Sequence, residues 1–188
     1  TQNLLDGFLK SLEIDINVRI EDEKQRDLAS IIKVSEISEG LVMEDERVKV
    51  TALKVVHGLL ENCFAFKFET KDKKVVFSGD TIYFPPLIEF SKDADLLVHE
   101  VMLERGINVL AERLKKVKPN LIDHLMISHT TAEDAAKLAK EANVKHMVFN
   151  HYVPHIPKEF PNSEFVDAAK RVWDGKITAG YDLCEIDF

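Results

Sequence analysis

The stretch CFAFKFETKDKKVVFSGD, residues 63–80, decides how this chain folds. Its first six residues alternate as in a β-strand, residues 71–73 form a polar turn, and Val75–Phe77 is the returning strand of a hairpin. That strand stops at Ser78-Gly79-Asp80, where the sequence changes from β-rich to alternating strands and helices. We therefore place the end of the β-rich part of the chain at Asp80.

The residues before the hairpin mix helical and strand patterns. Five apolar residues at helical spacing predict an amphipathic helix over residues 3–12. We expect an extended stretch at Asp15–Ile20 and a charged surface loop at Glu21–Asp27. The β-branched character of Ile31–Ile37 and Val48–Val56 predicts two strands.

Strands and helices alternate in the residues after Asp80. Thr130-Thr131-Ala132-Glu133 has the form of a capping box, which predicts that a helix with a small-residue face begins there. The other expected elements are a strand at Leu96–Val98, a helix at Ile107–Val117, a strand within Lys145–Asn150, a helix at Asn162–Trp173 and one or two strands in Lys176–Phe188. This order is typical of a layered α/β protein, and we expect residues 1–188 to form a single domain.

The composition indicates an acidic globular protein. Hydrophobic residues make up 45% of the 188 residues, which is enough to bury a core, and the formal net charge is −8. This charge provides no general attraction to phosphate backbones, so it argues against non-specific nucleic-acid binding. Cys63 and Cys184 lack CxxC spacing, which excludes a disulfide framework and a zinc finger, and we interpret both as small buried hydrophobic residues.

The sequence gives no sign of a membrane segment. No apolar run approaches the length of a transmembrane span, so we expect no membrane partner and a cytoplasmic location. The first residues, Thr1-Gln2-Asn3-Leu4, resemble neither a signal peptide nor an initiator methionine. We therefore expect further residues upstream.

Four polar side chains closely follow apolar stretches: His57, Asp80, His129 and His151. Strand ends are where layered α/β proteins place functional side chains, because a sheet holds them rigidly at the rim of a crevice. Imidazole and carboxylate are ligands for zinc or iron. The spacing alone is not a metal motif, and each residue also fits a plainer role, such as a hydrogen-bonded histidine or a turn aspartate.

Five segments follow one another in a characteristic order: Val55-Val56-His57-Gly58, Phe77-Ser78-Gly79-Asp80-Thr81, Leu97-Val98-His99-Glu100-Val101, Ser128-His129-Thr130-Thr131-Ala132 and Phe149-Asn150-His151-Tyr152. Together they resemble the successive motifs of the metallo-β-lactamase superfamily, and most closely its ribonuclease Z and arylsulfatase-like branch. The resemblance runs from about Asn3 to the C-terminus. It implies an αββα sandwich that lacks most of its N-terminal half here, because the His-x-His-x-Asp-His motif of that half does not occur.

The resemblance implies a dinuclear metal site. His57 would complete the first metal site, His151 the second, and Asp80 would bridge both, so that two divalent ions share a hydroxide. Zinc is the first choice of metal, with manganese and iron as alternatives. With only three of the ligands, the chain alone is expected to bind metal weakly and to be inactive, and the missing N-terminal half is its expected partner.

Two further residues match the ribonuclease Z branch. Glu100 resembles the glutamate of its His-Glu-Ala-Thr motif and His129 the histidine of its His-Ser-Thr motif, although Val101-Met102 replaces Ala-Thr and Thr130 replaces Ser. The implied roles are a glutamate that orients His129 and a histidine that protonates the leaving oxygen as a general acid. Asp80 is the third expected catalytic residue. The plainer alternatives are a helix-start residue for His129 and a solvated carboxylate for Glu100.

The resemblance implies a hydrolase that uses a metal-bound hydroxide on phosphodiester, sulfate ester, or carboxylic ester and lactone substrates, and a small-molecule ester is the first expectation. A tRNA 3′-processing endonuclease of the ribonuclease Z type ranks second, because only 22 residues separate His57 from Asp80 and leave no room for an RNA-binding arm. The third alternative is a non-catalytic module that needs a second chain to complete the metal site. A second copy of the chain, in a homodimer, is a further possible partner.

Other conspicuous residues have plainer interpretations. We interpret four histidines as structural or exposed, and expect one of them, His155, to line a substrate mouth: His99, His124, His146 and His155. Four basic residues form a solvated helix end: Arg113, Lys115, Lys116 and Lys118. Three alternating phenylalanines are expected in the core: Phe64, Phe66 and Phe68. The segment Tyr83–Pro86 is expected to form an apolar wall of the substrate pocket.

Overall fold

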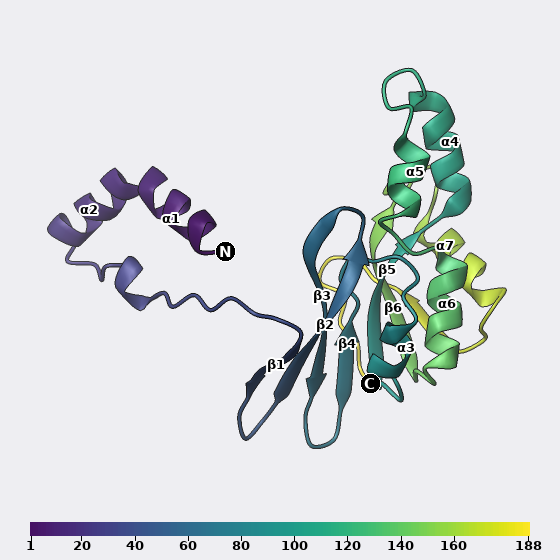
Figure 1. Ribbon diagram of the computed structural model, residues 1–188, viewed down its shortest axis with the longest axis horizontal. Helices are drawn as coiled ribbons and strands as arrows, with labels where there is room; N and C mark the ends of the chain where they lie inside the picture. The colour runs from purple at the N-terminus through teal and green to yellow at the C-terminus, as the bar shows by residue number, and fades with distance from the viewer. The chain divides into compact units, whose positions relative to one another are not determined.

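The computed structural model describes all residues from Thr1 to Phe188, which divide into two compact units, Thr1–Ile37 and Ser38–Phe188 (Figure 1). The first unit is helical and the second contains the whole sheet. The expectation that all 188 residues form one domain stays a prediction.

The N-terminal unit contains two consecutive helices, α1 (Gln2–Ser11) and α2 (Glu13–Asp22). The helix predicted over residues 3–12 is confirmed, but the extended stretch predicted at Asp15–Ile20 is wrong. The apolar residues of this stretch alternate as they do in a strand. However, Nε of Arg19 lies 2.8 Å from Oδ2 of Asp15, one helical turn away. This i,i+4 pair, together with acidic residues in the first turn, favours the helix.

The strand predicted at Ile31–Ile37 is also wrong. A short 3-10 helix, η1, covers Ala29–Ile31, and the residues from Ile32 to Ser38 form no regular element. β-Branched residues form a strand only where another strand pairs with their backbone, and no strand pairs with this segment. Neither α1 nor α2 buries a residue, and the apolar side chain of Phe8 is 59% exposed.

The second unit is built on a sheet of seven strands that lie in sequence order. The strands are β1 (Gly40–Glu44), β2 (Lys49–His57), β3 (Leu60–Glu69), β4 (Lys74–Phe77), β5 (Leu96–Met102), β6 (His146–Val153) and β7 (Lys176–Ala179). β1 to β4 pair antiparallel, whereas β4 to β7 pair parallel. The predicted hairpin and the change of character after β4 are therefore confirmed. β1 is a strand that the sequence patterns did not indicate, and β7 is the one closing strand.

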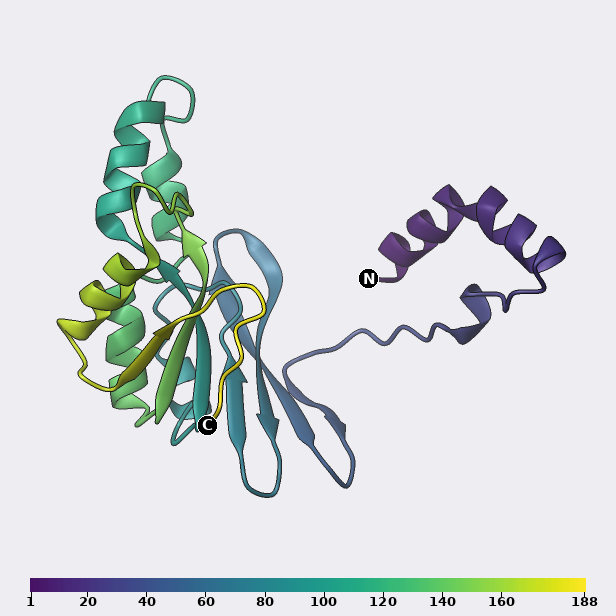
Figure 2. The ribbon, with the colours of Figure 1, turned by 180° about the vertical axis from the view of Figure 1, so that it is seen from behind.

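Five helices connect the parallel strands: α3 (Pro86–Phe90), α4 (Glu104–Leu114), α5 (Leu121–Met126), α6 (Ala132–Glu141) and α7 (Asn162–Lys170). The core lies where α3, α6 and α7 pack on the sheet, with Leu87, Leu138 and Phe165 against strand residues such as Leu97 (Figure 2). No helix of the chain combines the length and hydropathy needed to cross a bilayer.

The predicted capping box is shifted by one residue. Thr131, not Thr130, is the N-cap of α6, and its side chain accepts a hydrogen bond from the backbone N–H of Asp134 at 3.2 Å. Thr130 is instead buried, and its hydroxyl donates to the carbonyl oxygen of Thr81. Because Thr131 is the N-cap, Thr130 is free to connect the start of α6 to the loop after β4.

The three phenylalanines of β3 do not lie in the core, so that prediction is wrong. Ala65 between them is fully buried in the core cluster, and the phenylalanines therefore point to the opposite face of the sheet. Phe68 is 36% exposed and packs edge to face on Phe77, which is 41% exposed. Alternation predicts two faces, but it does not tell which face is covered.

His99 of β5 is fully buried, so it is structural and not exposed. Its Nδ1 lies 2.6 Å from the carbonyl oxygen of Glu100, while its Nε2 has no hydrogen-bond partner. Burial lowers the pKa of His99 below its ordinary value, because the low-dielectric core disfavours the imidazolium form. His146 is buried as well, with its Nε2 2.9 Å from the Thr178 hydroxyl.

We expect this buried imidazole to make the fold sensitive to acid. Below about pH 6.5, the unfolded state binds a proton at His99 that the folded state does not, so stability falls as the pH falls toward the lowered pKa. In that interval His99 contributes a slope of about 1.4 kcal/mol per pH unit, which His99→Phe should remove. Urea unfolding of both proteins from pH 7.5 to pH 5 measures the slopes, and parallel profiles would contradict the expectation.

Candidate metal centre

His57, Asp80, His129 and His151 come from four separate segments and meet in one cluster. His57 ends β2, Asp80 follows β4, His129 precedes α6, and His151 lies in β6. Ligand atoms of His57, Asp80 and His129 all lie within 4.8 Å of one another. Nε2 of His151 lies 3.3 Å from Oδ2 of Asp80. Asp80 is thus the residue that the three imidazoles share.

The backbone around His57 fixes the orientation of its ring. Nδ1 of His57 lies 2.7 Å from the carbonyl oxygen of Ser128. Because a carbonyl only accepts, this hydrogen bond requires the proton on Nδ1 and leaves the lone pair on Nε2. The adjacent Gly58 has φ +54 and donates to the Ile127 carbonyl at 2.8 Å. A partner of this kind on the second ring nitrogen is typical of metal-bound histidines.

Gly79 places Asp80 at the end of β4. Its φ is +61, a left-handed conformation that glycine adopts without strain. A Cβ at this position would lie 2.7 Å from the backbone oxygen of Phe64, which cannot move aside as a flexible side chain could. The Ser-Gly-Asp sequence therefore allows the chain to turn sharply and direct the carboxylate into the cluster.

We expect Gly79→Ala to destabilise the protein by about 2 kcal/mol or more, since it combines a strained φ with a backbone contact. The displaced Asp80 should also weaken metal binding. Thermal unfolding and metal titration of the variant measure the two effects. The control is Gly7→Ala in α1, where nothing lies within 4 Å of an added Cβ and alanine favours the helix. A Gly79→Ala protein as stable as the wild type would contradict this account of the turn.

His151 sits at an irregularity of the sheet. The pairing of β5 with β6 is Glu100 to Asn150 and then Val101 to Tyr152, so His151 is the extra residue of a bulge. Its φ is +42, a conformation that costs a non-glycine residue about 1–3 kcal/mol. Bulges next to functional sites redirect side chains. This one turns the imidazole of His151 toward Asp80.

Glu100 and His129 form a second layer behind the cluster. Glu100 is 1% exposed, and its Oε1 accepts hydrogen bonds from the backbone N–H groups of Thr130 at 2.8 Å and Thr81 at 3.3 Å. Its Oε2 lies 3.4 Å from Nδ1 of His129. Burial alone would lower the pKa of His129, but the adjacent carboxylate of Glu100, together with the charge of Asp80, raises it by more, so the net pKa is above its ordinary value. Glu100 is therefore not a solvated carboxylate.

The two residues that replace Ala-Thr in the first motif pack next to Glu100. Val101 and Met102 are both fully buried, and the backbone N–H of Met102 donates to the Thr130 carbonyl at 2.8 Å. The motifs do not indicate that Thr81 and Thr130 hold Glu100, nor that Ser128 is the partner of His57. These contacts are made by backbone atoms of segments far apart in the sequence, and no pattern of side chains predicts them.

The cluster fits a divalent metal ion in its chemistry. Two zinc ligands on opposite sides of an ion, at bond lengths of about 2.0–2.2 Å, lie up to about 4.4 Å apart, so the 4.8 Å spread of the ligand atoms requires only a small closure. Neutral imidazole and ionised carboxylate are suitable ligands for zinc, iron and manganese. His57, Asp80 and His151 thus offer donor atoms around the shared carboxylate, and His129 lies beside them.

The remaining predictions concern His155, the segment Tyr83–Pro86 and the two cysteines. His155 is exposed and lines a cavity together with His151 and Tyr152, and its place at a substrate mouth stays a prediction. In the segment Tyr83–Pro86, Tyr83 and Phe84 pack against the core and Tyr83 donates to Glu141 at 3.2 Å, and the role of the segment as a pocket wall stays a prediction. Cys63 and Cys184 are only half-buried, although buried positions were expected.

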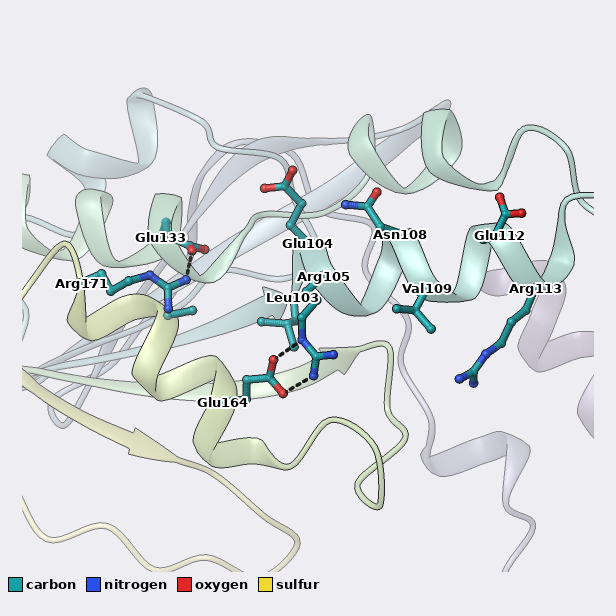
Figure 3. Close-up of a pocket in the computed structure, with 11 residues that line it drawn as sticks. Leu103, Glu104, Arg105, Asn108, Val109, Glu112, Arg113, Glu133, Glu164 and Arg171 are labelled. Carbon is teal, nitrogen blue, oxygen red and sulfur yellow. Dashed lines mark hydrogen bonds and ion pairs between the residues drawn. The ribbon is translucent and has the colours of Figure 1, made fainter.

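A separate cavity between α4 and α7 is lined by ion pairs (Figure 3). Arg105 binds Glu164 through two hydrogen bonds of 2.6 and 2.7 Å, and Arg171 pairs with Glu133. Because these arginines already have carboxylate partners, the cavity offers no free cation to an anionic ligand. It belongs to the packing of the helical layer.

Comparisons with known proteins agree with this geometry. The sequence profile of the Beta-lactamase superfamily domain matches residues 13–152. Ribonuclease Z from Mycobacterium marinum is 28% identical over 188 residues, which is all of this chain and 64% of that relative. This chain therefore spans less than two thirds of that relative's length.

Two solved structures share the fold. The metallo-beta-lactamase fold protein YhfI from Bacillus subtilis aligns with a TM-score of 0.59 and 19% identity, over 86% of this chain and 59% of that chain. The short form of human tRNase Z aligns with a TM-score of 0.52 and 21% identity, over 78% of this chain and 44% of that chain. The α/β class and the fold expected from the five motifs are confirmed, and the chain belongs to the metallo-beta-lactamase superfamily of hydrolases.

Proposed function

We propose that this chain is the larger part of a metal-dependent phosphodiesterase of the ribonuclease Z type, which cleaves the 3′ extension of RNA precursors. The observation that carries the proposal is the buried Glu100 held against His129 beside the Asp80 cluster. The similarity to ribonuclease Z from Mycobacterium marinum extends over the whole chain and supports the same function.

The ligand roles follow the motif order. We propose that His57 and His151 each bind one of two divalent ions, preferably zinc, and that Asp80 contacts both. When bound, the ions supply an activated water nucleophile and stabilise charge at the phosphoryl group. Three ligands are too few for two ions, so an N-terminal half with the remaining ligands is required for activity.

The second layer accounts for the kind of bond that is cleaved. An alkoxide leaving group of a phosphodiester is a strong base and leaves readily only when it is protonated. The carboxylate of Glu100 lies 3.4 Å from Nδ1 of His129 and favours its protonated form, and a ring nitrogen of His129 lies in the cluster. His129 then donates its proton to the leaving oxygen. A hydrolase of aryl esters needs such an acid less, because a phenolate is a weaker base than an alkoxide.

A small ester substrate remains the second candidate. The connection between β2 and β3 is the short turn at Gly58-Leu59, so the chain has no RNA-binding arm between His57 and Asp80. The net charge of −8 also provides little affinity for RNA. These features ranked small esters first from the sequence, and the similarity to ribonuclease Z now outweighs them.

The two candidates are distinguished by turnover measurements on the protein that includes the N-terminal half. The substrates are a 3′-extended tRNA precursor, bis(p-nitrophenyl) phosphate, an aryl sulfate and a lactone, each tested with zinc or manganese and with chelator. We expect metal-dependent cleavage of the precursor at a single position, with kcat/KM well above that for the small substrates. Efficient lactone or sulfate hydrolysis with an uncleaved precursor would overturn the proposal.

A further inference from the structure

Helices α4 and α5 form a helical arm, Glu104–Ile127, that extends past the end of the sheet (Figures 1 and 2). The loop at its tip covers residues 115–120, between the end of α4 and the start of α5. The arm follows the strand that carries Glu100 and leads directly into His129.

The arm is basic although the whole chain is acidic. It carries five basic residues and three acidic ones, within a chain whose formal net charge is −8. Three of the five cations already have partners, which are Glu164 for Arg105, Glu159 for Arg113 and Glu112 for Lys115. Lys116 and Lys118 make no ion pair and no side-chain hydrogen bond, and both are exposed. The free positive charge therefore lies at the tip.

The base of the arm is joined to the metal centre. Ile127 accepts the hydrogen bond from Gly58, and Ser128 accepts from Nδ1 of His57. One cavity is lined both by His57 and Leu60 and by residues of the arm, which are Asn120 of the tip loop and Asp123 and His124 of α5. The arm is thus fixed relative to the candidate catalytic residues and is not an independent appendage.

The length of the helical arm suits a substrate that extends well beyond the bond that is cleaved. At 1.5 Å per residue, Leu121–Ile127 spans about 10 Å, which corresponds to about three phosphates of a nucleic-acid strand. Charges farther apart than about 8 Å are largely screened at physiological salt, so the tip lysines act on their own surroundings and not through the net charge of the chain. A small ester bound at the metal centre would not reach them.

We propose that the helical arm binds the phosphate backbone of the RNA substrate through Lys116 and Lys118, and thereby takes the place of an arm between His57 and Asp80. This inference rests on the proposed function, since it requires an RNA substrate at the same centre. The contact is electrostatic and independent of sequence. It contributes to RNA affinity and leaves the chemistry at the metal centre unchanged.

The test is the double variant Lys116→Gln/Lys118→Gln in the protein that includes the N-terminal half. The control is Lys71→Gln/Lys140→Gln, which removes two exposed, unpaired lysines from the β3–β4 turn and the C-terminal end of α6. We expect the tip variant to lower kcat/KM for a tRNA precursor about tenfold, mainly through KM, and to reduce the slope of log affinity against log salt by about 1.4 to 1.8. Hydrolysis of bis(p-nitrophenyl) phosphate should be unchanged in both variants.

Binding of a fluorescent RNA, measured by anisotropy, separates the two proposals. Equal RNA affinity and equal salt slopes for the wild type and the tip variant would overturn the role of the arm, even if the precursor is cleaved. Weaker RNA binding by the tip variant, with no precursor cleavage by the wild type, would support the arm and overturn the proposed function. Equal RNA affinity, with weaker binding of the tip variant to anionic lipid vesicles, would overturn the arm in favour of a membrane contact.

Discussion

Replacing Asp80 by asparagine is expected to lower kcat/KM for a phosphodiester by at least about a thousandfold. Its carboxylate lies in a group with His57 and His129 and 3.3 Å from His151, so all the candidate ligands depend on it. Asparagine keeps the shape of the side chain but removes its charge. Loss of the charge would weaken the proposed interaction with two metal ions by several kcal/mol, and each 1.4 kcal/mol corresponds to a factor of ten in rate.

Activity and bound metal should be measured on the same preparation of this variant. The matched control is Asp72→Asn, at an exposed aspartate in the β3–β4 turn, which should keep full activity and metal content. Asp80 is half-buried at the protein surface, so the fold should survive its replacement. An Asp80→Asn protein with normal metal content and turnover would show that the cluster is not the catalytic centre.

The second large effect is expected for His129→Ala, at about 100-fold to 10,000-fold in kcat, which is the usual contribution of a general acid. The loss should depend on the leaving group. It should be large for an RNA precursor, whose alkoxide needs a proton, and small for p-nitrophenolate, which leaves without one. Metal content should stay near that of the wild type.

Two further variants test the connection between Glu100 and His129. Glu100→Gln should lower activity on the RNA precursor by less than His129→Ala, because the amide still occupies the space but no longer favours the protonated imidazole. The double variant should be no slower than His129→Ala alone, since residues that act as a unit are not additive. Loss of metal from the His129→Ala protein would instead make His129 a ligand, which its distance to His57 and Asp80 also allows.

The sequence predicted the parts of the fold that local patterns determine. The alternation in β3, the turn at residues 71–73 and the break at Gly79 define the hairpin and the change to parallel pairing after β4. The order of the motifs predicted His57, Asp80 and His151 at or near strand ends, and β2, β4 and β6 run in the same direction in one sheet, so their carboxyl ends lie at the same edge. The site followed from topology because each ligand is fixed by its own strand.

The parts that failed depend on long-range contacts. Asp15–Ile20 alternates as a strand does, but it has no strand to pair with and instead forms a helix with an ion pair. Phe68 alternates as a core residue does, yet the covered face of the sheet is the one that carries Ala65. The bulge at His151 is set by pairing between β5 and β6, which no local pattern contains.

The central claim is that His57, Asp80 and His151 hold two metal ions together with an N-terminal half. The most direct measurement is the number of metal ions per chain in the protein that includes that half, determined by elemental analysis for the wild type, His57→Ala, His151→Ala and Asp80→Asn. The account predicts two ions in the wild type, about one in each histidine variant and at most one in the aspartate variant. Two ions in all four proteins would contradict it.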